Sequence, residues 1–554
     1  MKVSNCIKIV GVLALVMLLL QTTTGFAAGS RFTYEKNNLG GVTLLPSPEY
    51  KLAQIRSVTV EADQFNEVYV NYGGMKLMFL PEELGGKPVT AIGPKCFYKA
   101  GTIQAISIPE GVVEIQDEAF VLFFTLRQAI LPDSLKTIGT EAFEHCDDLK
   151  YINIPASVTY IGPRAFSSEY VELNIAPDCI YTLMNGAIYH KGDKALTHYL
   201  PGLKNESYEI PRGIKVIGEN AFTNEYIQTI VLPDTLTTIE KEAFAGAPGI
   251  TQLMLPASLT TIGENAIPAS LEKITLDKNN TAFEMVDGAL YHIESKTLVW
   301  REPAAKNKKI VVKDGTKVIA NSACNGSTTL ETLVLPDSVE VIEESAFSNC
   351  SNLKKIEWSD SLVKIEPLAF ASCALDTLEL PASVQVIGNA FSNNQFKKLV
   401  LTGALNWSEA GYAFRDNKLL ESVVIGEGCT VLPSGIFMNC VSLTSVQLPS
   451  TLKLIDSSAF SKCSALAEIT LPEGLEKIEL WAFDGCSSLK EIVIPASITS
   501  MSYDVFPKTT CQGLFTSIST FIFLFFAKRN TPDGNVPVGC VQDAIVCAQF
   551  RTAA

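Results

Sequence analysis

Histidine and cysteine are the side chains of this 554-residue sequence best suited to metal binding or nucleophilic chemistry. There are 14 cysteines and only four histidines, which are His145, His190, His198 and His292. A zinc site needs three or four His, Cys or carboxylate ligands at characteristic spacings. His190 and His198 could be neighbours across a hairpin, but no cysteine or carboxylate cluster completes a ligand set around them. The sequence therefore predicts no metal site.

The sequence also offers no recognisable catalytic constellation. No nucleophile motif, glycine-rich phosphate loop or catalytic carboxylate pair stands out. Acidic pairs such as Glu343-Glu344 fall at variable turn positions, where a solvated face is the ordinary interpretation. We predict that the protein is not an enzyme and uses no cofactor. The net charge of −15 argues against a nucleic-acid partner, because phosphate binding depends on Lys and Arg.

Several cysteines share one position, three residues after a recurring phenylalanine. They are Cys146, Cys350, Cys373, Cys440, Cys463 and Cys486, and Asn394 and Asn417 occupy the same position elsewhere. Small residues at such a position pack against a turn or form hydrogen bonds with it. The alternative is a set of disulfides between repeats, but parallel side chains usually miss the dihedral angle that a disulfide requires. We therefore predict a row of free thiols.

Those phenylalanines define a repeat. An Ala-Phe pair or a close variant recurs mostly every 23 residues, with one step of 22, one of 21, and two gaps of 56 and 57. A fixed period over more than 400 residues indicates a repeat architecture. The second residues of these pairs form what we call the Phe column: Phe97, Phe120, Phe143, Phe166, Phe222, Phe244, Ile267, Cys324, Phe347, Phe370, Phe391, Phe414, Phe437, Phe460, Phe483 and Phe506.

One unit shows how a coil forms. Leu466-x-x-Ile469-x-Leu471 alternates like a strand with one buried face, and Pro472, which has no N–H to donate, ends it. Leu475 and Ile478 then point back into the coil. Each coil buries little alone and must stack on its neighbours. We predict a β-rich solenoid, a right-handed coil stack with one parallel sheet, short helical or 3-10 turns, and two inserted β-hairpins.

The 23-residue unit resembles the BspA-like, treponemal-type leucine-rich repeat. The segment GGKPVTAIG at residues 85–93 also resembles the way in which that family opens its array. The resemblance covers roughly residues 85–507. It implies a non-catalytic solenoid of a kind found in secreted and surface proteins of bacteria and some protists, several of which adhere to host proteins or other cells.

The two long gaps contain similar insertions, near residues 180–211 and 283–313. Asn185-Gly186 and Asp287-Gly288 are typical of tight β-turns, and a second short apolar segment follows each. Each insertion could be a projecting recognition element or a spacer that changes curvature. The spacer is the simpler interpretation, because surface loops tolerate insertions.

The outward residues of the predicted parallel sheet are the candidate binding face. They are hydrophilic and almost free of aromatic residues, so no compact binding anchor is visible. Such a face suits extended, weak and multivalent contacts, or simply keeps the sheet soluble. The candidate residues are Lys150, Tyr151, Asn153, Lys354, Lys355, Glu357, Thr377, Glu379, Lys397, Lys398, Thr444 and Gln447.

The N-terminal segments predict export and a cap. Residues 1–28 read as a signal peptide, with Lys2 and Lys8 before a 12-residue apolar core that is too short to span a bilayer. Residues 29–84 lack the repeat, and short apolar segments at 58–60 and 68–70 predict a β cap.

Residues 508–554 form an atypical hydrophobic tail. Its segment 513–527 holds five phenylalanines and precedes Lys528-Arg529. Three interpretations stay open: a membrane anchor, an apolar cap on the last coil, or a tail altered by truncation or a change of reading frame. Membrane contact through 513–527 belongs to the first.

Together these features predict a secreted or cell-surface protein for protein–protein or cell-surface recognition. Adhesion to a host or to other cells is one form that this recognition could take. The alternative is a structural cell-envelope scaffold without an external ligand.

Overall fold

The computed structural model describes residues 32–36, 42–46, 69–72, 75–84, 86–101, 103–166, 171–200, 205–223, 226–381, 384–402, 409–490, 492–502 and 504–506. The chain divides into two compact units, residues 1–270 and 271–554, which are considered separately below. The predicted signal peptide at 1–28 and the tail at 508–554 lie outside the described residues.

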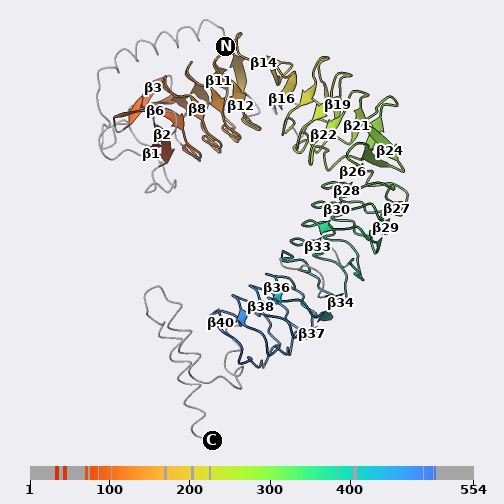
Figure 1. The fold of residues 1–554 in the computed structure, drawn as a ribbon. Helices are drawn as coiled ribbons and strands as arrows, with labels where there is room; N and C mark the ends of the chain where they lie inside the picture. Colours follow the sequence, from red (N-terminus) through yellow and green to blue (C-terminus); the bar gives the residue numbers. More distant parts are fainter. Residues whose placement is uncertain are drawn as a thin grey trace, which may run out of the picture. The chain divides into compact units, whose positions relative to one another are not determined.

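Each unit is a stack of coils, and each regular coil contributes two short strands. In the coil that begins at Phe437, β37 (Ser445–Gln447) comes from the Leu-x-x-Leu-x-Leu motif, and β38 (Leu454–Ile455) follows Pro449. The backbone N–H of Phe437 donates to the carbonyl of Ala459 in the next coil at 2.9 Å. We call the two kinds of strand motif strands and short strands. Successive coils lie side by side within each unit (Figure 1).

The predicted solenoid of leucine-rich repeat coils is confirmed, with two corrections. The first is that the coils form two kinds of parallel sheet rather than one. The short strands pair with one another separately from the motif strands, as in the sheet β36-β38-β39-β40, where β36 is Val431–Leu432, β39 is Lys477–Ile478 and β40 is Ser500–Met501. A strand of two residues is too short to show alternation, so the sequence pattern does not reveal it.

The second correction concerns the turns, because no helical or 3-10 segment occurs among the described residues. Residues two before and two after the Phe column adopt left-handed backbone angles. Ser458 (φ 58°) and Lys462 (φ 61°) flank Phe460 in this way. A left-handed residue interrupts any run of right-handed helical angles, so the connection remains a series of single turns.

In the first unit, motif strands and short strands alternate along the chain. The motif strands are β4 (Met75–Phe79), β7 (Ala105–Ser107), β9 (Gln128–Ile130), β11 (Tyr151–Ile154), β13 (Glu172–Ile175), β17 (Ser207–Glu209), β19 (Thr229–Val231) and β21 (Gln252–Leu255). The short strands are β6 (Lys87–Ile92), β8 (Glu114–Ile115), β10 (Thr137–Ile138), β12 (Tyr160–Ile161), β18 (Val216–Ile217), β20 (Thr238–Ile239) and β22 (Thr261–Ile262).

Strands of the predicted N-terminal segment extend both sheets of this unit. They are β1 (Phe32–Lys36), β2 (Val42–Pro46), β3 (Tyr69–Tyr72) and β5 (Glu83–Leu84). β1 and β2 are antiparallel, and β2 runs parallel to β6. β3 is antiparallel to β4, which pairs with β7. The expected strand at 58–60 lies outside the described residues.

The second unit repeats the same organisation. Its motif strands are β23 (Lys273–Leu276), β27 (Lys309–Val311), β29 (Thr332–Val334), β31 (Lys355–Glu357), β34 (Lys398–Leu401), β35 (Ser422–Ile425) and β37. Its remaining short strands are β28 (Val318–Ile319), β30 (Val341–Ile342), β32 (Lys364–Ile365) and β33 (Gln385–Val386). Residues 466–471, which match the strand motif, run through their coil without an assigned strand.

Both insertions form antiparallel hairpins, as predicted, and each continues into a third strand. The first comprises β14 (Tyr181–Met184), β15 (Ala187–His190) and β16 (Ala195–Tyr199). The second comprises β24 (Phe283–Val286), β25 (Ala289–His292) and β26 (Thr297–Arg301). The third strand of each pairs in parallel with a short strand, β18 or β28. Each insertion is therefore joined to a short-strand sheet by backbone hydrogen bonds.

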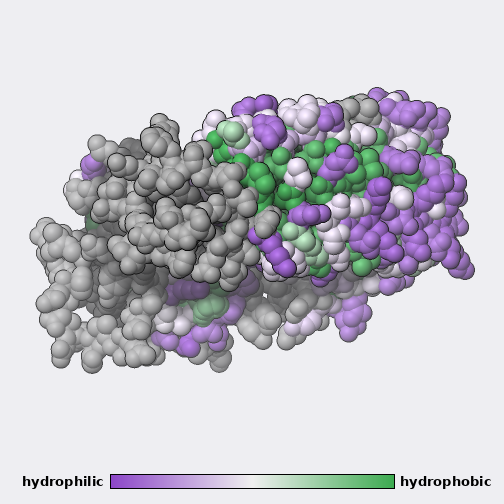
Figure 2. Space-filling view, turned by 90° about the horizontal axis from the view of Figure 1, so that it is seen from below, coloured by the Kyte–Doolittle hydropathy of each residue, from purple (hydrophilic) through white to green (hydrophobic). Residues whose placement is uncertain are grey.

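Stacked aromatic rings run through the core of each unit. Phe97 and Phe120 stack with their ring centroids 4.9 Å apart, and Phe460 and Phe483 do so at 5.4 Å. These rings are almost fully buried. Hydrophobic residues form a band bordered by hydrophilic residues in Figure 2. Within the described ranges no helix has the length and apolar character to cross a membrane.

Candidate functional site

The predicted binding face lies where expected in the first unit. Tyr151 and Asn153 are alternate outward residues of β11, both half-buried, and Lys150 precedes the strand and is exposed. The Asn153 side chain accepts from the N–H of Leu131 and donates to its carbonyl, both at 3.3 Å. This amide therefore clamps the neighbouring coil and contributes less to a free surface than Lys150 does.

In the second unit, the outward lysines and acids of the motif strands are exposed. Lys355 and Glu357 on β31 form an ion pair of 2.9 Å, and Lys354 lies beside them. The hydrogen bond and charge of Lys355 hold the pKa of Glu357 below its usual value. Lys397 and Lys398 stand at the start of β34, and both are exposed.

Two further candidates lie beside β37. Thr444 and Gln447 are exposed, and the Thr444 hydroxyl donates to the Glu421 carbonyl at 3.1 Å. The face therefore contains cationic positions on β31 and β34 and neutral polar positions at β37.

Thr377 and Glu379 do not lie on a strand, so their placement on the parallel sheet is wrong. Both are exposed, but residues 374–381 run without strand pairing, and the sheet β27-β29-β31 ends before them. The physical reason lies in the preceding turn. Phe370 is followed by the next core leucine, Leu375, after five residues, whereas the spacing in neighbouring coils is six. One missing residue shifts the following segment relative to its neighbours.

The face also contains outward apolar residues that sequence inspection did not single out. Val231 and Met254 in the first unit are 51% and 67% exposed, and Val311 and Val400 in the second are 62% and 54% exposed. Each occupies an x position of the strand motif, which was the signal that could have identified it. Dispersed apolar positions of this kind add contact area to a polar face.

The cysteine row is a structural feature of the coil turns. Cys463 Sγ donates to the Phe437 carbonyl of the preceding coil at 3.2 Å, and Cys486 makes the same bond to Phe460 at 3.1 Å. Asn394 Nδ2 replaces the thiol with a 2.8 Å bond to the Phe370 carbonyl. Burial raises the pKa of Cys486 to about 12, so the thiol remains protonated.

The prediction of free thiols is confirmed for the cysteines that the structure describes. All ten are free and buried: Cys96, Cys146, Cys179, Cys324, Cys350, Cys373, Cys429, Cys440, Cys463 and Cys486.

The histidines do not converge. His198 is buried, and its Nε2 lies 2.8 Å from the Gly162 carbonyl, while His190 pairs with Asp193 at 2.8 Å. Desolvation lowers the pKa of His198 to about 4, so the ring is neutral at pH 7. No group of three or more His, Cys, Asp or Glu in the described part of the chain is placed to hold a metal ion.

Two residues of the Phe column were missed by the search for Ala-Phe pairs. Tyr199 lies 23 residues before Phe222, and Arg301 lies 23 residues before Cys324. Their backbone N–H groups donate to Ala221 and Ala323 at 2.7 Å, as other column residues do. The 23-residue spacing alone could have identified both.

The surface of each unit thus presents exposed side chains on a rigid backbone. The motif strands hold polar and apolar groups at fixed spacing, which suits contact with a large partner. The arrangement offers no converging set of nucleophile, base and oxyanion donors of the kind that covalent catalysis needs.

Comparisons with known proteins agree with this architecture. The family model described as a BspA type leucine rich repeat region, in six copies, matches residues 89–192, 200–298, 317–410 and 410–523. A search of curated proteins gives no match.

The solved structures with similarity to the chain include several bacterial proteins. A leucine-rich cell surface protein of Faecalibacterium prausnitzii is 22% identical over 77% of this chain and 95% of its own, with a TM-score of 0.40. The pneumococcal vaccine antigen PcpA is 19% identical over 87% and 99%, with a TM-score of 0.29. A leucine-rich repeat protein of Eubacterium ventriosum is 19% identical over 75% and 94%, with a TM-score of 0.36.

The family match covers most of the coils described above, including the Phe column and the strand motif. Solenoids of this family are typically non-catalytic and belong to proteins that mediate recognition. The chain belongs to the BspA-type leucine-rich repeat family.

Proposed function

We propose that this protein is an exported recognition protein that binds a protein or cell-surface ligand through the outer face of its motif strands. The observation that carries the proposal is the set of exposed charged side chains on β31 and β34, held on rigid parallel strands. We further propose that it acts without catalysis, because no catalytic constellation accompanies this face.

The supporting features are the family and the predicted N-terminal signal. Residues 1–28 have the basic start and apolar core of a signal peptide, which supports a secreted or cell-surface location. Adhesion to host or other cells is the form of recognition that we propose, with binding spread over many weak contacts.

Electrostatics gives the proposed face a directional preference. Lys354, Lys355, Lys397 and Lys398 are exposed on the second unit, although the whole chain is acidic. A cluster of one sign attracts a partner of the other sign and accelerates association at low salt. We therefore expect an acidic protein surface to bind there, with an affinity that falls as salt rises.

The proposal is tested with the full chain on plates coated with fibronectin, laminin or collagen, and on intact cells. The face variant carries Lys354→Glu, Lys355→Glu, Lys397→Glu and Lys398→Glu. We expect saturable binding by the wild type and at least a tenfold loss in this variant. Absence of saturable binding to every surface would refute the adhesion proposal.

A matched control carries four exposed lysines to glutamate beside short strands instead of motif strands: Lys136, Lys215, Lys317 and Lys453. It has the same net charge as the face variant. Equal loss in the two variants would show that total charge, rather than the motif-strand face, determines binding.

A structural cell-envelope scaffold is the second candidate function. It is favoured by the length of uninterrupted repeat, which offers lateral contacts along the stack. Fractionation and cross-linking distinguish the two. Envelope partners that survive in the face variant, together with no binding to external ligands, would favour the scaffold.

A further inference from the structure

Two consecutive coils of the second unit have turns that are one residue shorter than those of their neighbours. Phe370 is followed by Leu375, and Phe391 by Phe396, five residues later in each case. In the flanking coils the spacing is six, from Phe347 to Leu353 and from Phe414 to Leu420. The two short turns withdraw backbone from the surface between two full-length turns.

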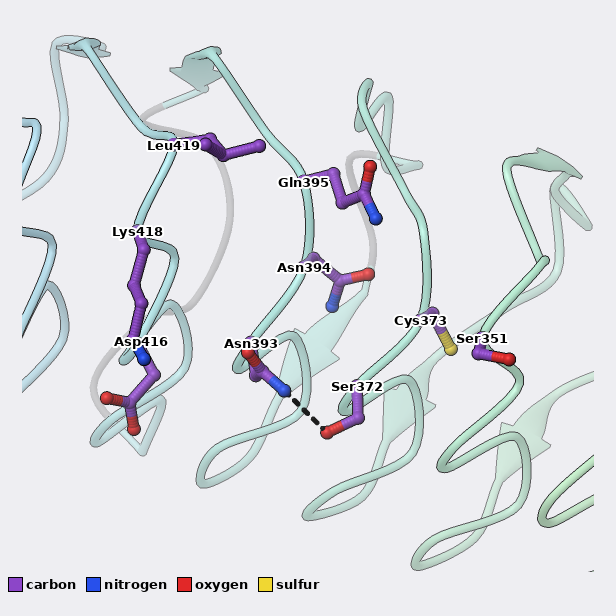
Figure 3. Close-up of a pocket in the computed structure, with 9 residues that line it drawn as sticks. All are labelled: Ser351, Ser372, Cys373, Asn393, Asn394, Gln395, Asp416, Lys418 and Leu419. Atoms are coloured by element: carbon purple, nitrogen blue, oxygen red, sulfur yellow. Dashed lines mark hydrogen bonds between the residues drawn. The ribbon is translucent and has the colours of Figure 1, made fainter.

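The withdrawn backbone leaves a pocket of about 340 Å³ between the full-length turns. Ser351 lines it from one flanking coil, and Asp416, Lys418 and Leu419 line it from the other (Figure 3). The short turns supply residues 372–373 and 393–395. Pockets that take small ligands start at roughly 300 Å³, so one small molecule could be accommodated.

The floor of the pocket is fixed by hydrogen bonds. Asn394 is 5% exposed, and its Nδ2 donates to the carbonyls of Phe370 and Phe391 at 2.8 and 3.1 Å. Its Oδ1 accepts from the N–H of Leu375 at 3.1 Å. Because these groups are satisfied within the protein, the floor holds its shape without a ligand.

The rim, by contrast, carries polar groups with unused hydrogen-bonding capacity. The side chains of Ser351, Gln395 and Lys418 form no hydrogen bond or ion pair with any other residue that the structure describes. Asn393 uses its Nδ2 on the Ser372 hydroxyl at 3.0 Å (Figure 3). Its carbonyl oxygen has no donor among the described residues.

The chemistry of this rim favours a neutral ligand rich in hydroxyl groups. Serine hydroxyls and the amides of Asn and Gln both donate and accept hydrogen bonds, as sugar hydroxyls do. The single ammonium of Lys418 faces the same pocket as the carboxylate of Asp416, which already accepts from Arg415 at 2.8 Å and from Asn439. Leu419, 49% exposed, adds an aliphatic surface for the C–H face of a sugar ring.

We propose that the pocket between the shortened turns binds a single sugar residue, free or at the end of a glycan. Gln395 and Lys418 hydrogen-bond its hydroxyl groups, and Leu419 packs against its ring. This site is separate from the motif-strand face of the proposed function, because its rim residues belong to the turns before the strands.

Saturation-transfer NMR on the full chain tests the proposal with the methyl glycosides of glucose, galactose, mannose and N-acetylglucosamine. We expect a saturable signal from at least one sugar, weakened at least tenfold in the Gln395→Ala/Lys418→Ala variant. Gln447→Ala removes an exposed glutamine from the motif-strand face and should leave sugar binding unchanged. Circular dichroism checks that the variants, whose changes are at exposed residues, remain folded.

A second variant restores the 23-residue turn by inserting a serine after Cys373 and another after Asn394. It should fill the pocket and abolish the signal even if the side-chain changes have a small effect. No saturable signal from any of the four sugars would overturn the proposal, as would equal binding by the wild type and Gln395→Ala/Lys418→Ala. Binding of a blocked tri-alanine peptide without binding of a sugar would also overturn it, and would assign the pocket to a peptide. Sugar binding by the Lys354/Lys355/Lys397/Lys398 face variant keeps this result independent of the proposed function.

Discussion

The two insertions share one framework and differ in what they bury. β14-β15-β16 and β24-β25-β26 have equivalent antiparallel registers, and each has an irregularity at the same place, after Ile188 in the first and after Leu290 in the second. Each tight turn has two left-handed residues, Asn185-Gly186 (φ 50° and 78°) or Asp287-Gly288 (φ 49° and 78°). The backbone of the insertion is therefore independent of the side chains at its end.

The difference lies at the last residue of the third strand. Tyr199 stacks on Phe222 with the ring centroids 5.3 Å apart, which continues the aromatic column. At the equivalent place Arg301 precedes the smaller Cys324, and the guanidinium bonds the Ser327 hydroxyl at 3.2 Å and the Asn307 carbonyl at 2.9 Å. The comparison indicates that the 23-residue spacing sets the position, while neighbouring residues adjust in size to whatever occupies it.

Truncation of Arg301 should give the largest effect, because this side chain is 1% exposed. Arg301→Ala leaves a cavity and two hydrogen-bond partners without a donor, so we expect the free energy of unfolding of the second unit to fall by about 4 kcal/mol. Urea denaturation combined with hydrogen exchange at β26 and β28 measures this loss.

Arg301→Met separates volume from charge. No carboxylate forms an ion pair with Arg301 in the part of the chain that the structure describes, and its Nε has no hydrogen-bond partner there. Methionine fills similar space without burying a charge, so its stability should lie within about 1 kcal/mol of the wild type. If methionine were as damaging as alanine, the hydrogen bonds rather than the packing would stabilise this position.

Acidic pH should destabilise the first insertion through His198, where the second insertion has Trp300. The folded pKa of about 4 lies below the usual 6.5, so between these values the unfolded chain binds a proton that the folded chain excludes. Stability is therefore complete above pH 6.5 and falls as the pH drops towards 4. At about 1.4 kcal/mol per pKa unit, the loss is roughly 3 kcal/mol.

Urea denaturation of the wild type and His198→Asn at pH 7 and pH 4 checks this prediction. Asparagine can still donate to the Gly162 carbonyl but does not titrate, so it should remove most of the difference that His198 causes. Carboxylates titrate in both proteins and cancel in the comparison. An identical pH dependence in the two proteins would show that His198 is protonated in the folded state without cost.

The sequence predicts the features that repeat and misses those that depend on single departures from the repeat. The Phe column and the strand motif were sufficient for the coil stack, because each has a side-chain type at a fixed spacing. Tyr199 and Arg301 occupy the column without resembling phenylalanine. The left-handed angle of Trp481 (φ 56°) is also hidden, because nothing about tryptophan favours that conformation.

The candidate face follows the same division. Lys355 and Lys398 lie on motif strands because their coils keep the regular spacing from the Phe column or restore it by the start of the strand. Thr377 departs from the sheet because its coil lacks one turn residue. The pocket beside it depends on two such omissions in succession, which a consensus motif does not register.

A smaller effect should come from the tyrosine pair of the first insertion. The hydroxyls of Tyr189 and Tyr208 lie 2.5 Å apart in the core, whereas Ile310 replaces Tyr208 in the second unit. Tyr208→Phe leaves the Tyr189 hydroxyl buried without this partner, and we expect a loss of about 2 kcal/mol by urea denaturation.

The double variant Tyr189→Phe/Tyr208→Phe removes both polar groups together. It should recover most of the stability, because no buried hydroxyl then lacks a partner. A double variant less stable than Tyr208→Phe alone would show that the pair contributes through more than this hydrogen bond.

The smallest effect should come from the turns that the insertions have in common. Gly288 has φ +78°, and a Cβ built there would meet its nearest atom, Glu302 Oε2, at an ordinary 3.6 Å. Gly288→Ala should therefore cost only the left-handed backbone strain, about 1 kcal/mol, measured by urea denaturation. Asp287→Gly at the preceding turn position, where φ is 49°, provides the control and should change stability by less than about 0.5 kcal/mol, because removal of strain offsets the added freedom of the unfolded chain. A loss well above 1 kcal/mol for Gly288→Ala would mean that the turn resists local adjustment, and that the shared framework is held more tightly than the side chains it carries.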